Sequence, residues 1–159
     1  MKIALDTNVL AYAEGTNGAT MRERALSVVR QLPPESVVVP AQTLGELFNV
    51  LVRKAKRRRA RARTAILSWR DAYPVIETSA TVLVDALDLA ADHELGIWDS
   101  IILSAAAEGE CRLLLSEDLQ DGFTWRGVTV ANPFAEQLHP VLAAVLVRDE
   151  SKSEDTADE

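Results

Sequence analysis

The chain opens with the sequence MKIALDTN (residues 1–8), a short apolar run followed at once by a carboxylate and two polar residues. The run from Ile3 to Leu5 predicts a buried strand, and Thr7 or Asn8 can cap a short helix after it. In open parallel α/β sheets, ligands collect outside the carboxyl ends of the strands. Asp6 is therefore the first candidate for chemistry, and other acids are expected to join it.

Strand-like and helix-like segments alternate along the rest of the chain. Further short apolar runs predict strands at 37–39, 75–76, 112–115 and 128–131. Apolar residues at helical spacing predict helices at 19–32, 43–53, 81–95 and 99–109, and one more between the basic tract and Pro74, with Gly96 closing the helix at 81–95. This alternation predicts a parallel sheet with helices on both faces.

The length of 159 residues suits one domain, which we expect to span residues 1–147. Residues 148–159 are polar and strongly acidic, and their composition predicts a disordered tail.

Several features predict a cytoplasmic protein without a membrane anchor. No apolar run approaches the ~20 residues that a bilayer requires, and Asp6 interrupts the N-terminal run too early for a secretory signal. The single cysteine, Cys111, fits a reducing compartment and is expected to be a core residue.

The net charge of −7 taken alone argues against a nucleic-acid partner, because phosphate contacts depend on Lys and Arg. The charges are segregated, however, with a basic tract at 53–63 and an acidic C-terminus. The tract is either a solvated helix face or a surface that binds a nucleic-acid backbone. The candidate nucleic-acid-binding residues are Lys54, Lys56, Arg57, Arg58, Arg59, Arg61 and Arg63.

Three acids besides Asp6 each have an ordinary structural explanation as helix-capping residues. Glu46 follows Thr43 as in a capping box, and Asp99 and Asp118 each precede a segment that they could cap. Yet Asp6 and Asp118 follow predicted strands and Glu46 begins the helix after one, which would bring three carboxylates to one sheet edge. Such a cluster is most stable around a divalent cation, and an all-oxygen ligand set favours magnesium or manganese.

Other catalytic arrangements are poorly supported. His93 and His139 lack metal-binding spacing, and the sequence contains neither a Gly-rich phosphate loop nor a Gly-x-Ser-x-Gly nucleophile motif. Metal-assisted hydrolysis is the chemistry that remains.

Four stretches in order resemble the PIN-domain ribonucleases, most closely the VapC-type toxins of bacterial toxin–antitoxin pairs. They are LDTN (5–8), Glu46 in the helix after the second strand, WDS (98–100) and LSEDLQDG (115–122), and the resemblance extends from about Lys2 to Phe134. It implies a three-layer α/β/α sandwich with a five-stranded parallel sheet.

The resemblance also implies roles for individual residues. It assigns Asp6, Glu46, Asp99 and Asp118 to the catalytic metal site, and it gives Asn8 and Ser116 the role of supporting the acidic pocket. Asp121 is a candidate fifth acid, although many relatives carry that acid where this chain has Gln120.

The function that the resemblance implies is that of a Mg²⁺- or Mn²⁺-dependent endoribonuclease whose products carry 5′-phosphate and 3′-hydroxyl ends. A VapB-type antitoxin is expected to inhibit it, covering apolar surface on the helices at 19–32 and 43–53, and the toxin is expected to be a homodimer.

Two alternatives belong to other classes of protein. A receiver-like signalling module also binds magnesium at a sheet edge, but it usually has adjacent acids after the first strand and a lysine after the last, where this chain has Asp6-Thr7 and Asn132-Pro133. The second alternative is a protein that binds an antitoxin but has lost its enzymatic activity, and the presence of all four acids argues against it.

Overall fold

The computed structural model describes residues 1–146. A central sheet has the strand order β3-β2-β1-β4-β6-β5, and all neighbouring pairs are parallel except β5 with β6. The strands are β1 (Lys2–Leu5), β2 (Val37–Pro40), β3 (Val75–Ile76), β4 (Cys111–Leu115), β5 (Thr124–Trp125) and β6 (Val128–Ala131). The helices are α1 (Thr7–Ala13), α2 (Gly18–Gln31), η1 (Pro34–Ser36), α3 (Ala41–Arg53), α4 (Arg59–Ala72), α5 (Ala80–His93) and α6 (Ile97–Glu108).

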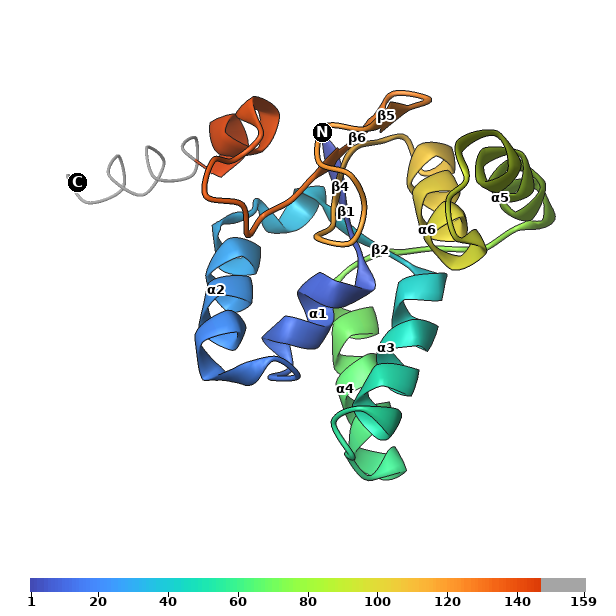
Figure 1. The fold of residues 1–159 in the computed structure, drawn as a ribbon. Helices are drawn as coiled ribbons and strands as arrows, with labels where there is room; N and C mark the ends of the chain where they lie inside the picture. Colours follow the sequence, from blue (N-terminus) through green and yellow to red (C-terminus); the bar gives the residue numbers. More distant parts are fainter. Residues whose placement is uncertain (147–159) are drawn as a thin grey trace.

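The helices form a layer on each face of the sheet, as the alternation of elements predicts (Figure 1). Ile3 and Leu5 of β1 point to one face, where they pack with residues of α1, α2 and α3. Ala4 points to the opposite face and packs with residues of α5 and α6, such as Leu89 and Ile102. The predicted three-layer α/β/α class is confirmed.

The sheet has six strands rather than the predicted five. The additional strand, β5, pairs antiparallel with β6 through a two-residue turn at Arg126 and Gly127. Both turn residues have positive φ, 44° and 84°, which is the backbone of a tight hairpin turn. The glycine after Arg126 is the local signal for this hairpin in the sequence.

Two predicted helix boundaries are wrong in their details. Gly96 does not close α5, because Glu94 takes the left-handed conformation there (φ 54°) and Gly96 instead lies at the N-cap of α6. Thr43 does not form a capping box with Glu46, because α3 begins earlier, after Pro40, and the Thr43 hydroxyl donates a hydrogen bond to the Leu5 carbonyl.

The chain beyond β6 packs on the same domain. Residues 140–146 are helical, and Leu142 and Val145 are buried in the core beside α1 and α2. Residue 147 and the predicted acidic tail at 148–159 lie outside the described residues. Within the part that is described, every helix is too short or too polar to span a bilayer.

Cys111 is buried in β4, as expected for a core residue. Burial raises the pKa of its thiol to about 11, despite the opposing effect of the nearby Lys2 charge. The neutral thiol is a poor nucleophile, so Cys111 has a packing role.

Candidate active site

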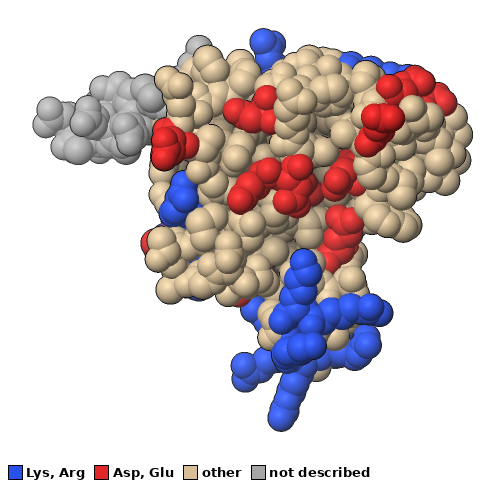
Figure 2. All heavy atoms as spheres, in the orientation of Figure 1, with Lys and Arg blue, Asp and Glu red and all other residues tan. Residues whose placement is uncertain are grey.

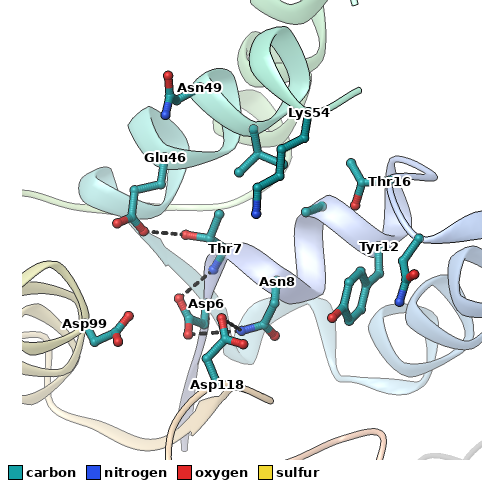
Figure 3. A pocket seen from close by; sticks show the side chains of 13 residues that line it. Asp6, Thr7, Asn8, Tyr12, Thr16, Glu46, Asn49, Lys54, Asp99 and Asp118 are labelled. Carbon is teal, nitrogen blue, oxygen red and sulfur yellow. Dashed lines mark hydrogen bonds between the residues drawn. The ribbon is translucent and has the colours of Figure 1, made fainter. Parts of the chain in front are cut away.

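The carboxyl edge of the sheet carries a pocket of about 560 Å³ between α1 and α3 (Figure 3). The pocket is lined by all four acids that the sequence nominates, Asp6, Glu46, Asp99 and Asp118. They come from the end of β1, from α3, from the first turn of α6 and from the loop after β4. The fold therefore gathers four carboxylates that are widely separated in the sequence.

Asp6 is almost fully buried, with 2% of its surface exposed. Its Oδ1 accepts a 2.6 Å hydrogen bond from the Thr7 backbone N–H, so Asp6 itself is the N-cap of α1, in place of the predicted Thr7 or Asn8. Its Oδ2 accepts hydrogen bonds from the Ser116 hydroxyl (2.6 Å) and from Asn8 Nδ2 (3.2 Å). These three donors fix the orientation of the carboxylate.

Asn8 and Ser116 connect the ends of β1 and β4. Asn8 Nδ2 also donates to Oδ2 of Asp118 (3.2 Å), while Asn8 Oδ1 accepts from the Glu117 backbone N–H (3.2 Å). The Ser116 oxygen accepts weaker hydrogen bonds from the backbone N–H groups of Asp118 and Leu119. Both side chains therefore contact Asp6, and Asn8 also contacts Asp118.

Glu46 is held by Thr7, for which the sequence predicts only a helix-capping role. The Thr7 hydroxyl donates a 2.7 Å hydrogen bond to Oε2 of Glu46 and so joins α1 to α3 within the pocket (Figure 3). The contact links segments thirty-nine positions apart, so no local sequence signal could reveal it.

Two of the acids have raised pKa values. Burial is the main cause for Asp6, whose pKa rises to about 7; hydrogen bonds from Ser116 and Thr7 oppose the rise, and the charges of Asp99 and Asp118 add to it. Burial also raises the pKa of Asp99, with further contributions from the charges of Glu46 and Asp118. Carboxylates that raise one another's pKa in a pocket are typical of functional sites.

The donor set is chemically suited to a hard divalent cation, because carboxylate oxygens line the acidic part of the pocket. The acids surround an open space instead of forming a closed cage. Within residues 1–146, no three His, Cys, Asp or Glu side chains converge tightly enough to form a finished metal site. Binding an ion would therefore require movement of the less tightly held acids, and Asp118 is the most exposed of the four.

Asp121 and the two histidines lie outside the pocket. Asp121 does not line the pocket, and its Oδ1 accepts a hydrogen bond from the Asn132 backbone N–H (2.8 Å), so it links the loop after β4 to the end of β6. His93 packs edge-on against Phe123 at the end of α5, and His139 Nδ1 accepts from the Val141 backbone N–H.

The structure divides the predicted basic residues into three groups. Lys54 lines the acidic pocket. Arg57 is half-buried and pairs with Glu14 at 2.7 Å. The rest are exposed around the tip of the α3–α4 hairpin, where Figure 2 shows basic side chains gathered below the acidic band: Lys56, Arg58, Arg59, Arg61 and Arg63.

The mostly parallel sheet and the acidic pocket at its carboxyl edge define an α/β protein with a carboxylate-lined site where such sheets bind their ligands. The family model of the PIN domain matches residues 3–121. The chain belongs to the PIN domain family.

Solved structures share this fold at low sequence identity. They include Mycobacterium tuberculosis VapC20, described as a sarcin–ricin loop cleaving toxin (TM-score 0.60, 19% identity, 71% of this chain and 87% of that one). A toxin–antitoxin complex from Klebsiella pneumoniae (0.63, 21%, 84% and 98%) and FitAcB from Neisseria gonorrhoeae (0.60, 19%, 83% and 98%) are also similar. Among curated proteins, no sequence matches this chain significantly.

Proposed function

We propose that this protein is a divalent-metal-dependent endoribonuclease and the toxin of a toxin–antitoxin pair. The observation that carries the proposal is the gathering of Asp6, Glu46, Asp99 and Asp118 around one pocket in a chain of the PIN domain family. Structures of the same fold are described as a sarcin–ricin loop cleaving toxin and as a toxin–antitoxin complex, which fits this function.

The four acids would hold Mg²⁺ or Mn²⁺, which when bound supplies Lewis-acid assistance to phosphodiester hydrolysis and favours 5′-phosphate and 3′-hydroxyl products. The protein's own side chains keep the carboxylates in place. Ser116 and Asn8 orient Asp6, and Thr7 orients Glu46. With no cation present, the acids repel an RNA phosphate, so the chain alone should bind substrate poorly at this pocket.

The test is to incubate structured RNA with the protein in Mg²⁺ or Mn²⁺, with and without EDTA, and to map the ends of the products. We expect cleavage that requires the metal, leaves 5′-phosphates and is absent in Asp6→Asn. Cleavage that persists in EDTA, or that is equal in Asp6→Asn, would rule out this active site.

We also propose that the exposed basic side chains at the hairpin tip hold the RNA backbone. Arg59 and Arg63 line a hollow of about 270 Å³ together with Phe48 and Ala60, and these arginines form no ion pair within residues 1–146. A chain with a net charge of −7 requires such a local positive surface to approach a polyanion.

Changing Arg58, Arg59, Arg61 and Arg63 to Gln in an Asp6→Asn background tests this surface. Each lost phosphate contact on single-stranded RNA should reduce the slope of log affinity against log salt by about 0.7. An unchanged affinity and slope would show that the tip is only a solvated surface.

A VapB-type antitoxin and a homodimer complete the proposal. The antitoxin is expected on α2 and α3, but no large apolar side chain is exposed on either helix. Within residues 1–146, most of the exposed large apolar side chains lie on α5 and at the start of α6. Leu83, Val84, Leu87 and Trp98 are 43–59% exposed there, and we propose that a second copy of the chain covers them.

Light scattering at micromolar concentration should give a dimer for the wild type and a monomer for Leu87→Glu. A monomeric wild type would contradict the proposed homodimer.

The antitoxin proposal has its own test. Co-expression with the product of the adjacent gene should yield a complex that no longer cleaves RNA. Failure of that product to bind the toxin would exclude it as the partner.

A further inference from the structure

The pocket extends beyond the four acids. Its second half is the groove between α1 and α3, lined by Tyr12, Thr16, Asn17, Asn49 and Lys54. Pockets that enclose a small organic ligand span about 300–1,000 Å³, so a pocket of about 560 Å³ has room for more than a metal ion. The groove is neutral or basic where the other half is acidic.

Lys54 is the cation of this groove. Figure 3 shows its side chain extending from the end of α3 into the pocket, with the amine directed toward α1. Four carboxylates line the same pocket, yet none of the ion pairs within residues 1–146 includes Lys54. Its ammonium group is therefore free to bind an anionic group of a ligand.

A half-buried cluster of hydrogen bonds, the clamp, ties the chain just after Lys54 to the end of α1. Arg57 donates to the Glu14 carboxylate (2.7 Å) and to the Glu14 backbone carbonyl (3.0 Å), and Trp69 Nε1 donates to the other oxygen of the same carboxylate (2.8 Å). Glu14 ends α1, and Lys54 ends α3 three positions before Arg57. The clamp thus joins the ends of the two helices and sets the width of the groove.

The remaining groove residues offer neutral hydrogen-bonding groups. Asn17 and Asn49 each present an amide donor and acceptor, which suit the edge of a nucleobase. Tyr12 adds an aromatic ring that carries a phenol hydroxyl. Unstacked bases of single-stranded RNA are recognised by aromatic and amide groups of these kinds.

We propose that the α1–α3 groove is a subsite for one unstacked nucleotide next to the scissile bond, in which Lys54 holds the phosphate and Asn17 and Asn49 contact the base. The inference rests on the proposed ribonuclease function and adds to it a place on this chain for the nucleotide beside the cut. Lys54 is a positioning residue, because it sets where the chain of phosphates lies relative to the acids.

The test compares Lys54→Gln with Arg53→Gln, using an RNA that the wild type cleaves. Arg53 is the exposed neighbour of Lys54 and does not line the pocket, so it is a matched loss of one positive charge. At saturating RNA we expect Lys54→Gln to reduce kcat by about tenfold or more, because misplacing a reacting group is expressed in the chemical step. Arg53→Gln should keep kcat within about twofold of the wild-type value, and Lys54→Arg should retain most of the wild-type kcat. All three variants should have the melting temperature of the wild type.

Cleavage-site mapping tests the contact with the base. Asn49→Ala should broaden the preference for the nucleotide beside the cut, while kcat on the preferred site falls less than in Lys54→Gln. An unchanged preference in both Asn49→Ala and Asn17→Ala would remove the base contact from the proposal.

Other outcomes overturn the subsite itself. Equal kcat in Lys54→Gln and wild type, or equal losses in Lys54→Gln and Arg53→Gln, would show that Lys54 does not position the substrate. If Lys54→Gln cleaves normally but escapes inhibition by the antitoxin, the groove is a protein contact and not an RNA subsite. A wild type that cleaves no RNA in Mg²⁺ or Mn²⁺ would overturn the ribonuclease proposal, and the subsite with it, which separates that failure from the others.

Discussion

The hydroxyl of Thr7 donates a 2.7 Å hydrogen bond to the Glu46 carboxylate and thereby ties the first turn of α1 to α3 across the pocket. Replacing Thr7 with Val removes the donor but keeps the shape of the side chain. We expect kcat for RNA cleavage to fall by about tenfold with little change in melting temperature, because Glu46 loses its fixed orientation. Single-turnover kinetics measure the effect.

Thr7→Ser is the matched control, since it keeps the hydroxyl and should retain most of the activity. If the Val and Ser variants cleave equally well, the hydrogen bond does not contribute to the reaction.

Asp6→Asn should abolish metal-dependent cleavage while leaving the fold intact. The amide oxygen can still accept from the Thr7 backbone N–H, but the negative charge that a cation requires is lost. Circular dichroism checks that the variant is folded, and isothermal titration calorimetry measures its affinity for Mn²⁺. Wild-type Mn²⁺ affinity in this variant would remove Asp6 from the site.

Stability of the metal-free protein should fall as the pH rises from about 4 to 7. The folded-state pKa of Asp6, about 7, lies above its ordinary value of 3.8, so the folded state binds the proton more tightly than the unfolded state. Ionisation of Asp6 therefore destabilises the fold, a cost that is absent below about pH 4 and complete above about pH 7.

Urea unfolding in EDTA measures this effect. Asp6→Asn should gain stability relative to the wild type as the pH rises from about 4 to about 7, by up to about 1.4 kcal/mol for each pH unit, and the difference should be constant at higher pH. Asp99, whose pKa is also raised, should leave a residual slope in the variant. Parallel curves for the two proteins would mean that Asp6 is already ionised at pH 5.

Asp118→Asn should cost far more activity than Asp121→Asn. Asp118 lines the pocket and accepts from Asn8, whereas Asp121 accepts from the Asn132 backbone N–H outside the pocket. Even residues that only support metal ligands usually contribute about 10–100-fold, so we expect at least that loss for Asp118→Asn and almost none for Asp121→Asn. The reverse order of kcat values would move the fourth ligand to Asp121.

Arg57→Gln should destabilise the protein by about 2 kcal/mol, because it leaves the half-buried Glu14 carboxylate without its charged partner. Arg58→Gln, at an exposed neighbouring position, should change stability by less than about 0.5 kcal/mol. Urea denaturation compares the two. Equal stability of both variants would mean that the Glu14–Arg57 pair contributes nothing to the fold.

The order of elements and the acids at their ends follow from the sequence alone. Short apolar runs such as Val37–Val39 are typical of strands buried on both faces, as in parallel sheets, and Asp6 directly follows another short apolar run. The parallel arrangement then brings the ends of β1 and β4 to the same edge, which predicts that Asp6 and Asp118 meet. These predictions depend on local patterns and general rules of topology.

The tertiary structure decided which polar residues face one another. Thr7 bonds to Glu46, and Arg57 to Glu14, across separations of thirty-nine and forty-three positions, and no local pattern encodes such pairs. The sequence groups Lys54 with Arg57 in one basic tract, but the end of α3 turns Lys54 into the pocket and Arg57 into the clamp with Glu14. Neighbours in sequence diverge in this way because the direction of a side chain depends on where its helix ends and on what packs against that end.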